Sequence, residues 1–194
     1  MKIDGRYTMY HRLPSGVLVP LFTKHNTQMI TSGHAIARTL GMGDISYKIN
    51  RMYVEFENVA TPATAVSVPS FSAAEDRGYY AALAAPKDYL RVPLLGAPTL
   101  GILSGYEAFF TDGVDGNMLT FLSQTEGSIG MHGVTFSNVL NSKVYGLAMV
   151  AAPSASDETQ DVIVTRDYYD VADQQIKPAS GQLTISWELG FPPC

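Results

Sequence analysis

Two glutamates spaced two residues apart are the side chains of this sequence best suited to acid–base chemistry. Glu55 and Glu57 occur in the stretch YKINRMYVEFENV, where apolar and polar residues alternate. In a β-strand this spacing puts both carboxylates on one face, roughly 6.5–7 Å apart. Glycoside hydrolases use carboxylate pairs at comparable separations, although their pairs usually come from different strands and line a cleft. The pair is therefore a candidate site for glycan hydrolysis, but the spacing favours a solvated strand face.

Nucleophilic and metal-dependent chemistry have weaker candidates. Ser104 in GILSG stands one position away from the serine of a G-x-S-x-G nucleophile elbow. The single cysteine, Cys194, has no neighbouring group that would activate it. The four histidines lie more than five residues apart and form no HExxH pattern. They are His11, His25, His34 and His132. We therefore predict no catalytic residue, no metal site and no cofactor.

An aspartate-rich turn, TDGVDGN, superficially resembles a calcium-binding loop, with Asp112, Asp115 and Asn117 as its oxygen-bearing residues. An EF-hand places oxygen ligands at positions one, three and five, followed by glycine. Here position three is Val114 and position five is Gly116. Because Asp-Gly pairs are preferred connectors of β-hairpins, the sequence predicts a turn at this point rather than a calcium site.

The chain carries few charges for its length. Of its 194 residues, 16% are charged and 46% are hydrophobic, against roughly 25% charged residues in an average soluble domain. Two interpretations stay open: a partner covers part of the surface, or the protein is a β-sandwich rich in Ser, Thr and Gly. The formal net charge of −5 argues against nucleic-acid binding, which needs clustered Lys and Arg. No apolar run approaches the roughly 18–20 residues of a membrane span.

The sequence also indicates where the chain is made. One cysteine excludes an internal disulfide framework. The first residues, MKIDGRYTMYHR, lack the apolar core of a signal peptide. We therefore expect the protein to fold in a reducing cytoplasm.

The N-terminal region predicts an extended element followed by one helix. The apolar stretches YTMYHR and GVLVPLF are separated by a Pro-Ser-Gly turn signal, and Pro20 limits the second stretch to an edge strand or an extended arm. We expect residues 1–24 to form an N-terminal arm or edge hairpin. In NTQMITSGHAIARTLGMGD apolar residues recur every three or four positions. This pattern predicts a packed α-helix near residues 28–40 with Gly41 as its C-terminal stop.

Strand patterns dominate the rest of the chain. Apolar and polar residues alternate in YKINRMYVEFENV and again in the last strand, QLTISWELGF. Beyond residue 88, short strand-like segments follow one another with turn residues between most of them. We predict a single all-β domain over residues 25–194: an antiparallel, jelly-roll-like β-sandwich with one short packed helix.

Three segments, about a third of the chain, resemble a group of bacteriophage virion proteins. HNTQMITSGHAIARTLGMGD followed by YKINRMYVEFENV is similar to their opening, where a T-x-x-G stretch starts a helix and an aromatic-acidic strand follows. VYGLAMVAAP resembles their strand with a Gly-Leu pair before a turn, and DVIVTRDYYDVADQQIKPASGQLTISWELGF resembles their ending. Tail-fibre, baseplate, collar-associated and head decoration proteins share such small β-domains. The resemblance implies an assembly component, and it supplies no catalytic residues.

We therefore expect a non-enzymatic structural subunit of a virion, associated with the tail, collar or fibre and assembled in the host cytoplasm. It would act by self-association, as a trimer or ring, and by docking to other virion proteins. The contacts expected are an N-terminal arm that adds a strand to a neighbour's sheet, and the exposed polar face of the strand in YKINRMYVEFENV. The candidate interface residues are Tyr7, Tyr10, Val17, Val19, Leu21, Phe22, Tyr53, Glu55 and Glu57.

Three other functions stay open at this point. One is a capsid decoration (cement) protein. Another is a carbohydrate-binding module in which loop tyrosines such as Tyr79 and Tyr80 hold host surface glycans. The third is a glycan hydrolase that relies on the glutamate pair.

Overall fold

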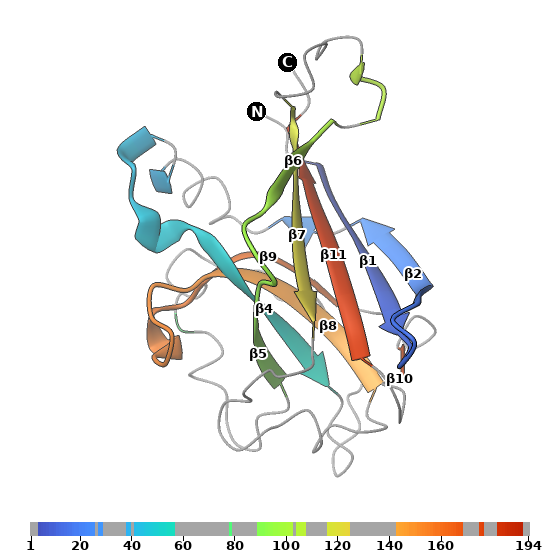
Figure 1. Cartoon of the computed structure of the whole chain (residues 1–194). Coiled ribbons are helices and arrows are strands. Elements are labelled where there is room, and N and C mark those ends of the chain that lie inside the picture. The colour runs from blue at the N-terminus through green and yellow to red at the C-terminus, as the bar shows by residue number, and fades with distance from the viewer. Residues whose placement is uncertain are drawn as a thin grey trace.

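Strands account for most of the chain that the computed structural model describes (Figure 1). The described residues are 4–25, 27–28, 38–39, 41–56, 78, 89–102, 104–107, 116–124, 143–168, 175–176 and 182–191. The strands are β1 (Asp4–Arg12), β2 (Leu18–His25), β3 (Thr27–Gln28), β4 (Ile49–Phe56), β5 (Tyr89–Pro93), β6 (Thr99–Gly101), β7 (Met118–Gln124), β8 (Lys143–Ala151), β9 (Val162–Tyr168), β10 (Gln175–Ile176) and β11 (Gln182–Gly190). Two short 3-10 helices, η1 (Ile45–Tyr47) and η3 (Glu158–Gln160), precede β4 and β9.

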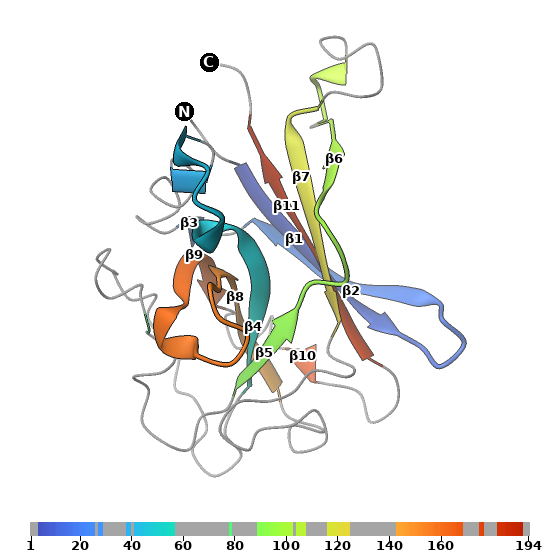
Figure 2. The ribbon, with the colours of Figure 1, turned by 60° about the vertical axis from the view of Figure 1, so that its left-hand side comes forward.

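The strands form two antiparallel sheets that pack against each other (Figures 1 and 2). Within the described residues, the first sheet has the order β2-β1-β11-β7-β6, and the second has the order β3-β9-β8-β4-β5 with β10 paired to β8. The sheets are joined at one corner, where the Leu95 amide donates to the Leu122 carbonyl at 2.9 Å. This architecture is the antiparallel β-sandwich that the sequence predicts.

The alternation in the last strand places its apolar residues between the two sheets. Leu183, Ile185, Trp187 and Leu189 are all buried. The Trp187 ring lies 4.9 Å from the ring centroid of Tyr7, on the neighbouring strand β1. Residues from β4, β5, β7 and β8 complete the same core. Burial of each large apolar side chain contributes roughly 1.5–3 kcal/mol. The four buried side chains of this strand therefore stabilise the packing of the two sheets.

Residues 4–25 form a hairpin that is built into the first sheet. Strand β1 is hydrogen-bonded on both sides, to β11 and to β2, while β2 is an edge strand. The turn between β1 and β2 is closed by a hydrogen bond of 2.8 Å from the Gly16 amide to the Leu13 carbonyl. Gly16 has a φ of 86°, which favours glycine. The far end of this hairpin extends beyond the body of the molecule (Figure 2).

The helix predicted near residues 28–40 lies mostly outside the described residues. Residues 38, 39, 41 and 42 are helical, so the helix continues past Gly41. Gly43, with a φ of 65°, takes the left-handed stop position instead. The prediction of Gly41 as the stop is wrong because both glycines satisfy the sequence pattern and only the backbone distinguishes them. Within the described residues, no helix is long and apolar enough to cross a membrane.

Candidate functional site

The outer face of β4 is buried. Tyr53 is fully buried and Glu55 is 3% exposed, so the prediction that these residues form an exposed face is wrong. Tyr53 donates to Asp161 of the segment before β9, and Glu55 is bound by Arg166. The outer face of the second sheet also carries a second apolar cluster, whose members are Tyr53, Tyr89, Ala148, Val150, Ala152 and Ile163. Alternation predicts which residues share a face of a strand, but it does not predict what covers that face.

Glu55 forms an ion pair with Arg166 of strand β9. The Nε and Nη2 atoms of Arg166 each lie 2.9 Å from a different carboxylate oxygen of Glu55. The pair spans β8, which contributes Gly146 and Ala148 at this level and so leaves room for the arginine to cross. A buried carboxylate bound in this bidentate way is not open to a substrate. Glu55 therefore no longer supports the hypothesis of a glycan hydrolase.

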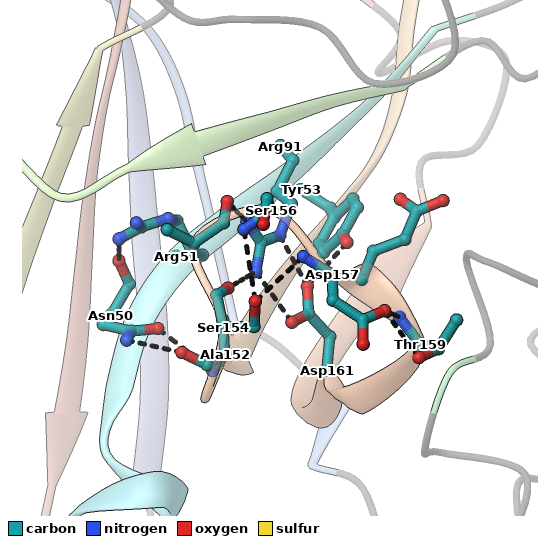
Figure 3. Close-up of polar contacts among 12 residues, drawn as sticks. Asn50, Arg51, Tyr53, Arg91, Ala152, Ser154, Ser156, Asp157, Thr159 and Asp161 are labelled. Atoms are coloured by element: carbon teal, nitrogen blue, oxygen red, sulfur yellow. Dashed lines mark hydrogen bonds and ion pairs between the residues drawn. The ribbon is translucent and has the colours of Figure 1, made fainter.

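A second ion pair fixes the loop between β8 and β9 (Figure 3). Arg91 of β5 donates from Nε to Asp161 Oδ2 at 2.7 Å and from Nη2 to Asp161 Oδ1 at 2.8 Å. The same guanidinium donates to the backbone carbonyls of Ser154 and Ala155, at 2.5 and 2.6 Å. Tyr53 donates its hydroxyl to Asp161 Oδ2 at 2.7 Å. One buried arginine therefore anchors the β8–β9 loop to the second sheet.

Two buried tyrosines complete this arrangement. The Tyr89 hydroxyl contacts both carboxylate oxygens of Glu158, at 2.9 and 2.8 Å, and the Tyr53 and Tyr89 ring centroids are 5.2 Å apart. Burial raises the pKa of both hydroxyls above the ordinary tyrosine value, and the neighbouring carboxylates raise it further. Both hydroxyls therefore remain protonated donors at neutral pH. The buried polar cluster, as we name it, consists of Tyr53, Tyr89, Arg91, Glu158 and Asp161.

The buried polar cluster positions a loop. Its carboxylates accept hydrogen bonds from the arginine and the two tyrosines, and its arginine also holds two backbone carbonyls. The Asp161 carbonyl in turn accepts a hydrogen bond of 2.8 Å from the Gly78 amide. Gly78 has a φ of 65°, and a Cβ there would lie 2.8 Å from the Thr159 carbonyl oxygen. These close contacts fix η3 against the sheet and indicate a structural role.

The other candidate catalytic and metal-binding residues that the structure describes do not lie close together. His11 lies on β1, His25 lies on β2 and Ser104 lies in an exposed turn. Asn117 is buried and donates to the Phe191 carbonyl at 3.4 Å. In the part of the chain that the structure describes, no three His, Cys, Asp or Glu side chains gather where they could hold a metal ion. The remaining candidates, Glu57, His34, His132, Asp112, Asp115, Tyr79, Tyr80 and Cys194, lie outside the described residues.

Exposed apolar residues gather at the far end of the β1–β2 hairpin. Val17, Leu18 and Val19 are 56%, 46% and 40% exposed, and we refer to them as the hairpin tip. Val17 and Val19 are among the interface residues predicted from the sequence, and Leu18, which is not among them, is exposed as well. The sequence signal for this exposure is the position of Leu18 in GVLVPLF, close to the Pro-Ser-Gly turn.

The other N-terminal candidates contribute mainly to the fold. Tyr7 is fully buried and donates its hydroxyl to Asp167 at 2.7 Å. Leu21 and Phe22 are partly buried and pack against the core between the sheets. Tyr10 is half-buried. These residues stabilise the hairpin, while the hairpin tip is the part of it that is available for contact.

The edge of β2 is poorly suited to adding a further strand. Pro20 has no amide hydrogen to donate. The pairing register between β1 and β2 shifts between Met9 and Tyr10, which marks an irregularity around Leu21 on the edge strand. Prolines and bulges are features by which sheet proteins avoid edge-to-edge pairing. The geometry therefore favours contact through side chains of the hairpin tip over the strand addition that we expected.

An apolar pocket of about 170 Å³ opens between the two sheets. Leu119 and Leu189 line it from the first sheet, and Ile49 and Val164 line it from the second. It lies at the opposite end of the first sheet from the hairpin tip, because Leu189 pairs with Gly5 at the start of β1. Its residues come from distant parts of the chain, so no sequence pattern indicates it.

Comparison with known proteins assigns the chain to no family. No family model, no curated protein and no solved structure matches the chain. The functional inference therefore rests on the residues themselves and on their arrangement.

Proposed function

We propose that this chain is a non-enzymatic structural component of a bacteriophage virion, associated with the tail, collar or fibre. It acts by self-association and by docking to other virion proteins. The observation that carries the mode of action is the hairpin tip, an exposed apolar group on an element that extends from the sandwich. The assignment to a virion is supported by the three sequence segments that resemble phage virion proteins.

The hairpin tip has the character of a contact surface. Single exposed apolar residues are ordinary on protein surfaces, but here three consecutive residues are exposed. Because neighbouring side chains of a strand point to opposite faces, Leu18 and Val19 present apolar surface on both faces of the hairpin, and a partner that encloses the tip would cover both. Covering them removes apolar surface from water, at roughly 25 cal/mol for each Å². A partner that covers the tip therefore gains binding energy without any change in the sandwich.

The distribution of charge agrees with a structural role. Arg91, Asp161, Arg166 and Glu55 are buried in ion pairs of the second sheet. Catalysis needs acids or bases that meet a substrate, and these groups meet one another instead. These buried ion pairs therefore support a rigid subunit.

The virion assignment is tested in purified particles of a phage that encodes this chain. Mass spectrometry of density-purified particles should detect the chain at a fixed copy number. A V17D/L18D variant should accumulate in the cell but be depleted from particles, because charge on the tip prevents its burial. Ser15→Asp, which adds a charge to the exposed turn beside the tip, should remain in the particles. Absence of the unaltered chain from purified particles would contradict the proposal.

A further inference from the structure

We propose that the apolar pocket between the sheets binds a small amphipathic carboxylate with an apolar body of about six carbon atoms. The pocket has a volume of about 170 Å³. An apolar protein cavity of about 150 Å³ admits a benzene molecule, so one six-carbon group is the size that fits. This inference does not depend on the proposed function.

The pocket wall is apolar and belongs to rigid elements. Phe121 and Leu189 are buried residues of the core between the sheets, and both also line the pocket. Leu119, Ile49 and Phe191 are partly buried, pack against that core and line the pocket as well. A site held by two packed sheets exists before the ligand arrives, which lowers the entropy lost on binding.

A lysine provides the charge that selects an anion. Lys48 lines the pocket and is itself exposed, so its stem contacts the wall while its ammonium group reaches solvent. No carboxylate in the described part of the chain pairs with Lys48. The nearby Arg38 is already engaged, because it donates to Asp44 at 2.7 and 3.0 Å and lies over the Tyr47 ring at 4.7 Å. Lys48 is therefore the cation left to receive a carboxylate at this pocket.

The rest of the pocket wall offers a ligand only apolar contact. Thr39 lines the pocket, but its Oγ1 atom is buried away from the space that a ligand would fill. Lys48 is therefore the residue that discriminates between ligands of equal size, and its positive charge favours an amphipathic anion over an uncharged or cationic ligand.

The test is a titration of the full chain with heptanoate, followed by NMR of the backbone amides. We expect saturable shifts that are confined to the pocket-lining residues. Pentanoate, which is two methylenes shorter, should bind about fifteenfold more weakly, because each buried methylene contributes about 0.8 kcal/mol. Hexylamine, which has a body of similar size and the opposite charge, should bind more weakly than heptanoate.

Two variants assign the binding to this pocket. Lys48→Glu should weaken heptanoate binding about three- to tenfold and strengthen hexylamine binding, since an exposed charge contributes modestly. Arg12→Glu, the same change of charge near the hairpin turn at the other end of β1, should leave both affinities unchanged. Leu119→Phe should reduce the space and abolish binding, and unchanged amide spectra away from the pocket will show that this variant is folded.

Three results would overturn the proposal. The first is no saturable shift with heptanoate in the unaltered chain. The second is heptanoate binding that Lys48→Glu leaves unchanged. The third is heptanoate binding that weakens as the protein concentration rises and that Leu18→Asp restores. This result would mean that the pocket binds the hairpin tip of a second copy, which competes with heptanoate.

Discussion

The outer faces of the two sheets are built in opposite ways. On the second sheet the outer face is buried and holds two bidentate arginine–carboxylate pairs, Arg166 with Glu55 and Arg91 with Asp161. On the first sheet the outer face meets solvent, where Arg6 pairs with Glu188 and Thr8 with Thr23. The hairpin tip then extends from this open sheet. The second sheet thus buries charged side chains that stabilise the fold, whereas the hairpin tip exposes apolar side chains that a partner could contact.

Of the two interpretations of the 16% charged residues, the structure confirms the β-sandwich, and a partner that covers part of the surface stays a prediction. Four of the charged residues are buried in two pairs that orient a sheet face and a loop. The two faces can therefore be separated by experiment: changes in the buried polar cluster should affect folding, and changes in the tip should affect association.

The largest effect is expected from Arg91→Met. This change leaves Asp161 buried without its cation and frees the carbonyls of the β8–β9 loop, so the free energy of unfolding should fall by about 3–5 kcal/mol. Urea denaturation measures it. The matched control is Arg6→Met, which breaks an ion pair whose arginine side chain is half exposed and should cost about 1 kcal/mol or less. Equal losses in the two variants would contradict the contrast between the faces.

The next effect appears at alkaline pH. Burial and neighbouring carboxylates raise the pKa of Tyr53 and Tyr89 in the folded protein. Their contribution to stability is therefore complete below the unfolded tyrosine pKa of about 10 and is lost as the pH rises toward the folded values. Each tyrosine should lower the free energy of unfolding by about 1.4 kcal/mol per pH unit above pH 10.

Urea denaturation between pH 9 and 11 checks this dependence. The Y53F/Y89F variant should be less stable than the unaltered chain at pH 9, because Asp161 and Glu158 lose hydrogen bonds. Its stability should then fall less steeply above pH 10. Parallel pH profiles for the two proteins would show that the tyrosines are not buried donors.

A smaller effect comes from two glycines that should respond in opposite directions. Gly78→Ala should cost about 1–3 kcal/mol, because the position has a φ of 65° and a Cβ would contact the Thr159 carbonyl. Gly41→Ala should stabilise by about 0.5–1 kcal/mol, because the position is helical and nothing lies within 4 Å of a Cβ there. Thermal unfolding measures both changes. Stabilisation by Gly78→Ala would mean that η3 is not held against this residue.

The sequence predicts the sandwich well because alternation is a local property. The residues of β11 that alternate are the ones found in the core, and the strand and turn pattern after residue 88 gives the fold class. The buried face of β4 could not be predicted in this way, since its cover depends on Arg166 and Asp161, more than 100 residues away. One signal was present: in DVIVTRDYY the run Val-Ile-Val does not alternate, which is typical of a strand buried on both faces. Val162–Asp167 are indeed all buried.

The hairpin tip shows a different limit. The sequence predicts Val17 and Val19 as contact residues and leaves open whether residues 1–24 form an extended arm or an edge hairpin. The pairing of β1 with β11 on one side and β2 on the other makes this segment an edge hairpin of the first sheet, and contact through the two valines stays a prediction. Long-range strand pairing of this kind leaves no local pattern.

Sedimentation velocity of the purified chain, over a range of concentrations, tests the central claim most directly. We expect the unaltered chain to form a discrete oligomer, the V17D/L18D variant to be a monomer, and Ser15→Asp to behave as the unaltered chain does. Each variant should change the free energy of unfolding by about 0.5 kcal/mol or less, because these residues are exposed. A chain that is monomeric at every concentration, or an oligomer that persists when the tip is charged, would contradict the account.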